Sequence, residues 1–283
     1  MSNWLDRRVI AFAHQGGSFE GPSSTLGAIE QAAAAGATAI ELDVHATADG
    51  QLVVCHDATV DATTNGHGAI AAMTLAQLRE LDSAYWFTPG ATATPGREAS
   101  AYPWRGRAPV DRRYGVATLE EVVAAVPGVL LNLDIKQTAP DVRPYESLLA
   151  REIERLECAH RVIVASFLDR AIESFRREAP GVATSAATEE TATFFFSSLE
   201  GQPVLPPAVA FQVPETYGDV TVVDERFVEA AHNAGVAVHV WTINDQSGMD
   251  RLLDLGVDGL VSDRPSMLAE TIARRVLTWD GAC

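Results

Sequence analysis

The sequence predicts an α/β protein, a (β/α)8 TIM barrel with an insertion after the second strand. The main observation is that short apolar, β-branched runs recur eight times, with helical or irregular segments between them. The length of 283 residues is also near the usual size of such a barrel. We therefore expect a single barrel domain over residues 1–283, with strands at residues 9–14, 38–44, 128–136, 161–167, 181–187, 208–214, 235–243 and 256–263.

Segments with helical periodicity separate several of these strands. Apolar residues recur at three- and four-residue spacing in the segments 25–37, 147–159, 169–181 and 224–236. Three of these segments have a glycine as their last residue or the one before it, and glycine commonly follows the last turn of a helix. Strands that alternate with helices in this way favour a parallel sheet with helical crossovers.

A further apolar run, LVVCHD from Leu52, does not fit as a barrel strand. Only the segment ATADGQ separates it from the second strand, which is too short for a parallel crossover. The Asp49-Gly50 pair is a typical hairpin turn, so we expect the run to fold back on the second strand. This hairpin places His56 near the rim of the barrel, at the carboxyl ends of the strands.

An irregular insert is expected at about residues 57–117. Its part from Tyr85 to Tyr114 is rich in Pro, Gly and aromatic residues and has neither helical nor strand periodicity. Long loops of this kind usually serve as lids or binding segments. The segment also contains arginines that either recognise an anionic ligand or pair with surface acids. These are Arg97, Arg105, Arg107, Arg112 and Arg113.

The charge of the chain restricts its partners. Acidic residues outnumber basic residues by 38 to 21, and the formal net charge is -17. This charge repels nucleic acid and anionic lipid surfaces, so an anionic substrate would need local positive charge, such as a metal ion. The N-terminal residues include too few apolar side chains for a signal peptide or a membrane span. Scattered cysteines without a disulfide framework also suit a cytoplasmic location, while the oligomeric state is left open.

Acidic residues occupy one face of the second predicted strand. Alternate strand residues share a face, so Glu41 and Asp43 point the same way, and the third strand presents Asp134 and Lys136 by the same alternation. Buried carboxylates need a compensating cation, and oxygen ligands suit Mg2+ or Ca2+ better than Zn2+. We predict one divalent cation held by these three acids. Internal ion pairs or an exposed strand edge are the alternative.

Two histidines end strands near the same rim. His14 ends the first strand and His56 ends the hairpin, so the pair can act as general acid and general base on a bound anion. Metal ligation or a structural role is the competing interpretation. His45 shares the face of Glu41 but follows the expected strand end.

Several motifs together resemble the glycerophosphodiester phosphodiesterase family. They are AHQGG, the run PSSTLGAIEQAAAAGATAIELDV, DGQLVVCHD, VDATTNGHG, LDIK, WTIN and GVDGLVSDRP, in the family's order and over nearly the whole chain. The resemblance implies a TIM barrel of the phosphatidylinositol-specific phospholipase C-like superfamily. It also implies hydrolysis of glycerophosphodiesters to an alcohol and glycerol phosphate. A route open to this family is a cyclic phosphate formed by the substrate's own 2-hydroxyl.

The resemblance assigns roles to individual residues. His14 and His56 match the catalytic acid and base, and the metal ligands match Glu41, Asp43 and Asp134. Lys136 matches a lysine that contacts the phosphate, and Trp241 matches a pocket wall, although packing within the barrel would explain this tryptophan equally well.

The chain departs from the family pattern at several positions. Gln15 stands where an arginine usually follows the first histidine, so that arginine's phosphate contact is lost or replaced, with Gln15 as the candidate substrate-binding residue. PSST replaces the PENT type of segment, Ala62 replaces an arginine, and Asp134 replaces the more common glutamate. These changes affect the substrate more than the chemistry, since each matched catalytic position keeps a workable side chain.

Other functions stay open. A lysophospholipase D or sphingomyelinase D-like enzyme could accept an acyl chain against the phenylalanines at 194–196, although such a run is more often buried core. A noncatalytic binder of phosphorylated metabolites would not need two histidines. A glycosidase would use paired carboxylates but explains neither the histidines nor Lys136.

Overall fold

The computed structural model describes residue 4 and residues 9–136 and 145–275. Eight parallel strands form the predicted barrel in the order β6-β5-β4-β2-β1-β11-β10-β7. A single parallel bridge between Ser185 and Ala210 joins the two ends of this series, so the barrel is nearly closed. The strands are β1 (Ile10–His14), β2 (Ala39–Ala46), β4 (Leu130–Ile135), β5 (Val162–Ala165), β6 (Ala183–Thr184), β7 (Ala210–Pro214), β10 (Ala237–Trp241) and β11 (Gly259–Ser262).

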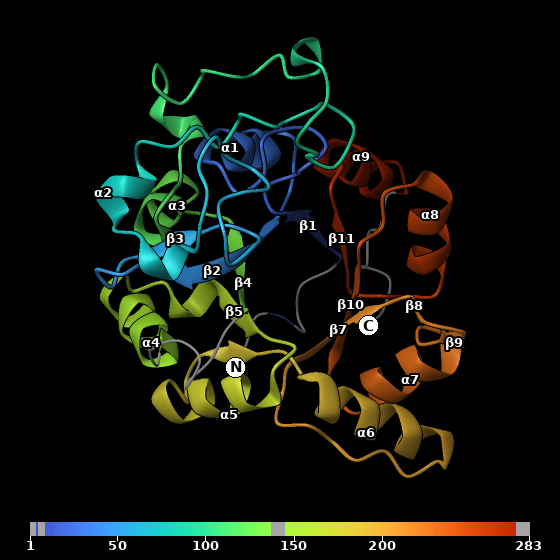
Figure 1. Cartoon of the computed structure of the whole chain (residues 1–283). Coiled ribbons are helices and arrows are strands. Elements are labelled where there is room, and N and C mark those ends of the chain that lie inside the picture. The colour runs from blue at the N-terminus through green and yellow to red at the C-terminus, as the bar shows by residue number, and fades with distance from the viewer. Residues whose placement is uncertain (1–3, 5–8, 137–144, 276–283) are drawn as a thin grey trace.

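Helices surround the strands (Figure 1). Each segment with helical periodicity contains a helix, and further helices follow strands where the sequence pattern is weaker. Thr25 caps the first helix through its side chain, and Gly36 adopts a positive φ of 103° just beyond its end. The helices are α1 (Leu26–Ala34), α3 (Leu119–Ala125), α4 (Tyr145–Arg155), α5 (Asp169–Glu178), α6 (Thr188–Leu199), α7 (Glu225–Asn233), α8 (Gln246–Asp254) and α9 (Pro265–Arg274). No helix within the described residues is long and apolar enough to cross a membrane.

Alternation along the strands divides the core into layers. Phe12 points into the barrel, where its ring stacks on Trp4 at 6.2 Å and lies 4.9 Å from the ring of His239. Ile40 and Leu42 point outward and pack with the helices. A parallel strand buried on both sides needs apolar residues at nearly every position, which explains the near-continuous apolar runs.

The hairpin after the second strand has the predicted form. β3 (Leu52–Val54) pairs antiparallel with the end of β2, with Val44 opposite Val54. Gly50 has a φ of 77°, a conformation that favours glycine at the turn. β2 runs through Ala46, so the expectation that His45 follows the strand end was wrong: the hairpin pairing extends the strand past this buried histidine.

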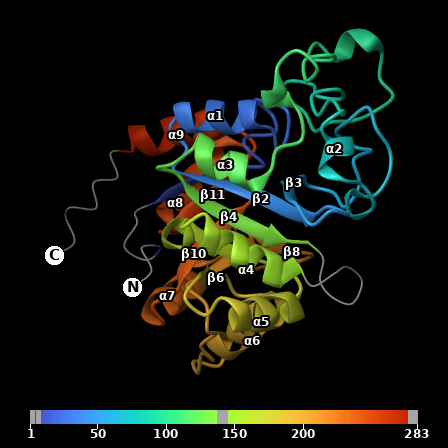
Figure 2. The same cartoon turned by 90° about the vertical axis from the view of Figure 1, so that its left-hand side faces the viewer.

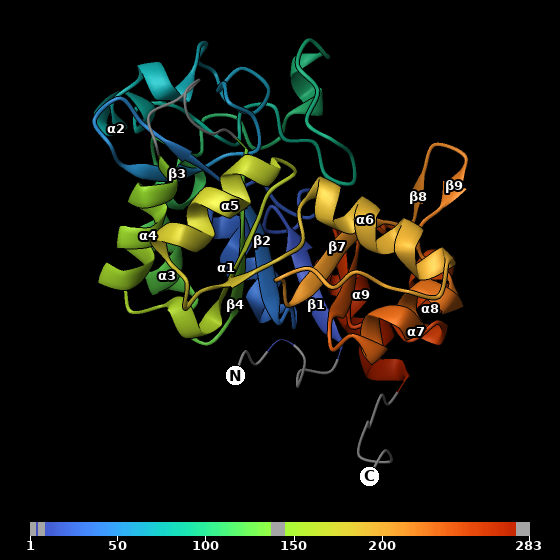
Figure 3. The same ribbon diagram turned by 90° about the horizontal axis from the view of Figure 1, so that it is seen from below.

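The insert between β3 and α3 is mostly irregular. It contains one short helix, α2 (Leu75–Leu78), and the 3-10 turns η1 (Ile70–Ala72), η2 (Ala99–Ala101) and η3 (Arg112–Tyr114). Figures 2 and 3 place it at the same end of the barrel as a small hairpin formed by β8 (Thr216–Tyr217) and β9 (Val220–Thr221), which the sequence did not predict.

Arginines hold the insert together by internal contacts. The guanidinium of Arg105 lies 4.2 Å from the ring centre of Tyr102 and 4.3 Å from that of Tyr85. Arg107 covers the ring of Trp104 at 4.2 Å, and Arg113 donates hydrogen bonds to Asp111. These contacts favour a structural role for these three arginines over the alternative of an anionic ligand.

Candidate active site

A cavity of about 640 Å³ lies at the carboxyl ends of the barrel strands. Residues of β1, β2, β4, β5, β7, β10 and α6 line it, together with the β8–β9 hairpin. The carboxyl ends of the strands are where barrel enzymes place their catalytic residues, because side chains from several strands converge there.

Three buried carboxyl groups meet at one side of this cavity. Asp43 of β2 pairs in register with Asp134 of the neighbouring β4, and Glu41 lies two residues earlier on the same face. One oxygen from each of the three lies within 4.8 Å of the others. Burial raises the pKa of Glu41 to about 8, with a smaller contribution from the charge of Asp134. Burial, and then the charge of Glu41, raise the pKa of Asp43 to about 7.

Lys136 partly offsets the charge of these acids. Its Nζ lies 2.8 Å from Oδ1 of Asp43 and 2.7 Å from Oδ2 of Asp134. Burial alone lowers the pKa of Lys136, but the charges of Asp134 and Asp43 outweigh it and hold the pKa above its ordinary value. The lysine therefore keeps its positive charge, and its side chain also lines the cavity.

The acidic cluster has the properties of a divalent cation site. Oδ2 of Asp43 and Oδ1 of Asp134 are buried and have no hydrogen-bond partner among the described residues. One lysine cannot neutralise three carboxylates, and buried oxygens without partners are costly. Three hard oxygen ligands suit Mg2+ or Ca2+, which complete their coordination with water or substrate.

His14 and His56 face each other at the cavity. Their ring centres are 6.5 Å apart, and both line the cavity together with Glu41. Nδ1 of His14 lies 2.6 Å from Oδ1 of Asp263, and Nδ1 of His56 lies 2.7 Å from Oδ1 of Asp57. Because an ionised carboxylate only accepts hydrogen bonds, both Nδ1 atoms donate, which makes Nε2 the basic atom of each ring.

Asp263 is a site residue that the sequence reasoning did not select. It follows β11, whose strand pairs with β1, and this adjacency brings it to His14 across 249 positions of sequence. Ser18 and Asn244 each donate to it at 2.6 Å. Burial raises the pKa of Asp263, but the hydrogen bond and charge of His14, together with the hydrogen bonds from Ser18 and Asn244, hold the pKa below its ordinary value. A polar residue at the end of the eighth predicted strand was the signal available in the sequence.

Gln15 contacts His14 at Nε2 and is not among the residues that line the cavity. Its Nε2 is 3.2 Å from Nε2 of His14, and its Oε1 accepts a hydrogen bond of 2.6 Å from Ser23. The hydroxyl of Ser23 thereby orients the amide so that the NH2 group points at the imidazole. Two departures from the family pattern, Gln15 and the PSST segment, thus contact each other directly.

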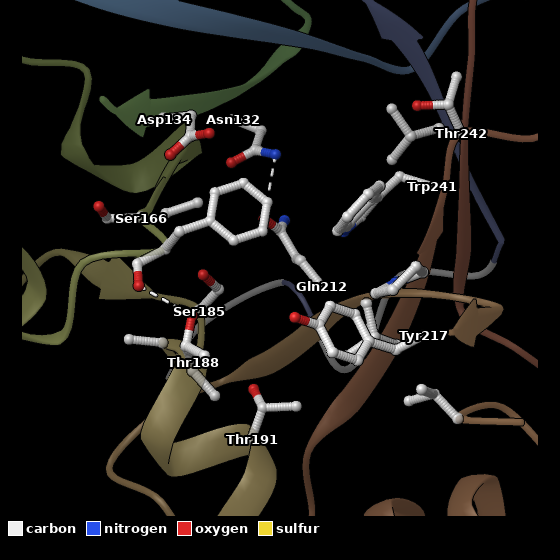
Figure 4. A pocket seen from close by; sticks show the side chains of 18 of the residues that line it. Asn132, Asp134, Ser166, Ser185, Thr188, Thr191, Gln212, Tyr217, Trp241 and Thr242 are labelled. Carbon is white, nitrogen blue, oxygen red and sulfur yellow. Dashed lines mark hydrogen bonds between the residues drawn. The ribbon is translucent and has the colours of Figure 1, made fainter. Parts of the chain in front are cut away.

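Trp241 lines the cavity on the side away from the acids. Figure 4 shows Asp134 and Asn132 on one side, with Trp241 and Tyr217 across from them. The ring of Trp241 meets the ring of Phe167 edge to face, with centres 5.6 Å apart. Phe167 in turn lies near the charged groups, since its ring centre is 5.6 Å from Nζ of Lys136.

Comparison with known proteins identifies the family of the chain. The sequence matches the Glycerophosphoryl diester phosphodiesterase family over residues 14–267. It is 30% identical to a probable glycerophosphodiester phosphodiesterase 2 of Mycobacterium tuberculosis, over 96% of this chain and 94% of that protein. A glycerophosphodiester phosphodiesterase of Bacillus subtilis is also 30% identical, over 92% of this chain and 85% of that protein.

Solved structures share the fold. A glycerophosphoryl diester phosphodiesterase domain from Mycobacterium tuberculosis superimposes with a TM-score of 0.76 at 24% identity, covering 94% of this chain and 99% of that one. An Oleispira antarctica phosphodiesterase, solved in complex with the product sn-glycerol-3-phosphate, has a TM-score of 0.72 at 24% identity, covering 96% of this chain and 100% of that one. The chain therefore belongs to the glycerophosphoryl diester phosphodiesterase family, a family of phosphoric diester hydrolases.

Proposed function

We propose that this chain hydrolyses glycerophosphodiesters to an alcohol and glycerol phosphate, as a single catalytic domain with an insert at about residues 57–117. The observation that carries the proposal is that one cavity contains two facing histidines beside a buried cluster of three carboxyl groups. A phosphodiester needs charge compensation on its nonbridging oxygens and a proton for its leaving group. The names of the relatives and the glycerol phosphate product in the Oleispira structure support the same substrate class.

Glu41, Asp43 and Asp134 would hold one divalent cation, Mg2+ or Ca2+. A cation bound there supplies positive charge that polarises the phosphoryl group. Lys136 lines the same cavity and keeps its charge, so we propose that it contacts a nonbridging phosphate oxygen. Trp241 bounds the substrate on the opposite side.

The two imidazoles divide the proton transfers. One takes the proton of the attacking hydroxyl, and the other protonates the oxygen of the departing alcohol. We propose that the attacking group is the 2-hydroxyl of the substrate's glycerol, so that a cyclic phosphate forms and water opens it afterwards. Attack within one molecule benefits from the proximity of the two groups. Asp263 and Asp57 hold the rings in the orientation that presents Nε2.

Activity against a small set of phosphodiesters tests this function. We expect alcohol release from glycerophosphocholine, glycerophosphoethanolamine and glycerophosphoglycerol in the presence of Mg2+ or Ca2+, measured by coupled assays of the free alcohol. Glycerol phosphate should accumulate in equal amount. Binding of these compounds without release of any alcohol would instead indicate a noncatalytic binder.

Gln15 is proposed to position His14 and to act on the substrate through it. Gln15→Met keeps the volume of the side chain but removes the hydrogen bond to Nε2 of His14. One such bond contributes about 0.5–1.5 kcal/mol, so kcat should fall about three- to tenfold while KM changes little. Ser23→Ala, which frees the amide, should change kcat in the same direction by a smaller factor. If kcat is unchanged in both variants, the positioning role is wrong.

A further inference from the structure

The motifs WTIN and GVDGLVSDRP meet beside His14. Asn244 is the last residue of the first motif and follows β10, while Asp263 lies in the second motif and follows β11. β10 and β11 pair in parallel, so both residues come to the carboxyl ends of neighbouring strands. β11 also pairs with β1, whose last residue is His14. Three adjacent strands therefore bring an amide, a carboxylate and an imidazole to the same rim of the barrel.

Asn244 and Asp263 hold each other by two hydrogen bonds. Oδ1 of Asn244 accepts from the backbone N–H of Asp263 at 2.8 Å and from the hydroxyl of Ser262 at 3.1 Å. An amide oxygen that faces two donors fixes the direction in which the amide group points. Nδ2 of Asn244 therefore faces the carboxylate, where it donates to Oδ2 of Asp263 at 2.6 Å.

The other oxygen of the Asp263 carboxylate receives two donors. Nδ1 of His14 and the hydroxyl of Ser18 each lie 2.6 Å from Oδ1. Because Asn244 engages Oδ2, the carboxylate cannot rotate without breaking at least one hydrogen bond to a charged acceptor, and such bonds are stronger than those between neutral groups. The orientation of the His14 ring thus depends on two side chains bound to its aspartate.

The loop after β1 brings Ser18 to the carboxylate. Gly17 has a φ of 89°, and a Cβ atom at this position would lie 2.6 Å from Cγ of Pro265. Glycine therefore allows this loop to approach the first turn of α9 closely. The backbone N–H of Phe19 donates to the carbonyl oxygen of Asp263 at 3.1 Å, which fixes the loop beside the aspartate.

The aspartate paired with His56 has a different environment. The side chain of Asp57 is 45% exposed, whereas that of Asp263 is 9% exposed. Within the described residues, the only hydrogen bond to the Asp57 carboxylate is the one from His56. Water competes with a hydrogen bond between exposed groups, but it competes less in a buried network whose members are all engaged. The protein therefore supports its two histidines unequally.

We propose that Asn244 and Ser18 are positioning residues for the reaction: they hold the Asp263 carboxylate, and this carboxylate sets the orientation of the His14 imidazole. Neither residue lines the cavity, so neither is placed to contact the substrate. The inference rests on the proposed function, in which His14 carries out one of the two proton transfers. A misaligned ring transfers its proton less efficiently, so loss of either residue lowers kcat and leaves KM nearly unchanged.

Single substitutions in the full chain give the first measurement, which is choline release from glycerophosphocholine with Mg2+ or Ca2+ present. Asn244→Ala should lower kcat about tenfold, because it removes the only donor to Oδ2 of Asp263 within the described residues. Ser18→Ala should lower kcat about threefold, since His14 still engages the same oxygen. The KM should change less than about twofold in both variants.

Asn233→Ala is the matched control. Asn233 is an exposed asparagine at the end of α7 and does not line the cavity, so the kcat of this variant should equal that of the original chain. Thermal unfolding confirms that each variant is folded. If Asn244→Ala does not fold, Ser18→Ala tests the same role, because its hydroxyl contacts only the Asp263 side chain among the described residues.

Double variants separate positioning from a general effect on the fold. If Asn244 acts through Asp263, Asn244→Ala should lower kcat less than about twofold in the Asp263→Asn background, where the support of His14 is already disturbed. In the Asp57→Asn background, which disturbs His56 instead, Asn244→Ala should keep its effect of about tenfold. Ser18→Ala should show the same dependence on the background with its smaller factor.

The outcomes separate this inference from the proposed function. Equal effects in the two backgrounds, a change confined to KM, or an unchanged kcat in both folded single variants would overturn the positioning role and leave the proposed function intact. Failure of the original chain to release alcohol from any glycerophosphodiester would overturn the proposed function and this inference with it.

Discussion

His14→Ala and His56→Ala are each expected to lower kcat for glycerophosphodiesters by a factor of about 10²–10⁴, the usual contribution of a general acid or base. The two ring centres lie 6.5 Å apart with the ring planes nearly perpendicular, and each ring is oriented by a carboxylate on Nδ1. Removal of either ring leaves one of the two proton transfers without its general acid or base. The measurement is steady-state alcohol release by purified variants at saturating metal.

His67→Ala provides the matched control for the two catalytic variants. Its Nδ1 also pairs with an aspartate, Asp61, at 3.2 Å, but its side chain is 85% exposed and it does not line the cavity. The kcat of the His67→Ala variant should equal that of the original chain.

Asp263→Asn should lower kcat by a smaller factor than His14→Ala, because the ring remains and only its orientation is disturbed. Folded His14→Ala and His56→Ala variants with full activity would show that the histidines are not the acid and base.

Loss of the acidic cluster should have an effect of similar size. Glu41→Gln, Asp43→Asn and Asp134→Asn each remove one charged oxygen ligand from a group whose ligand atoms lie within 4.8 Å of one another. We expect each change to weaken binding of Mg2+ or Ca2+ and to lower kcat/KM by about 10² or more, since the cation supplies charge that the phosphoryl group needs. A chelator should abolish the activity of the original chain, and the preferred cation should restore it.

Thermal unfolding gives a readout of the same site that does not depend on turnover. A ligand that binds only the folded state raises the melting temperature, so Mg2+ or Ca2+ should stabilise the original chain. The shift should be smaller in the Asp43→Asn variant. Glu173→Gln changes an exposed acid on α5 and should keep the full shift. Activity that survives chelation, together with melting temperatures that do not respond to either cation, would argue against a metal site.

Much of the barrel could be predicted from local patterns. Each predicted strand overlaps a strand of the observed barrel, and the Asp49-Gly50 turn and short ATADGQ segment indicated the β2–β3 hairpin. Strand alternation placed Glu41 and Asp43 on one face, and the same rule applied to Asp134. These features depend on the period of two along a strand and on the length of a connection, both of which are visible in the sequence.

Other parts of the site depend on distant pairings. Asp263 reaches His14 only because β11 lies beside β1, and Gln15 reaches Ser23 through a turn whose backbone has a positive φ at Gln15. The phenylalanines of α6 divide between roles: Phe194 is fully buried, while Phe196 is exposed at the cavity. Hydrophobicity alone does not distinguish these two environments, because the direction of each side chain is set by how α6 packs on the barrel.

The sequence by itself determined the fold class, the order of the strands along the chain and the acidic face of the second strand, because each depends on residue periodicity over a few positions. The tertiary structure decided which groups meet. It brings the two imidazoles together at the cavity, places Asp263 against Nδ1 of His14, and brings apolar side chains of α6 and the β8–β9 hairpin to the same cavity. The physical reason is that barrel closure brings together the ends of strands far apart in sequence, and contacts of this range leave no periodic trace in the chain.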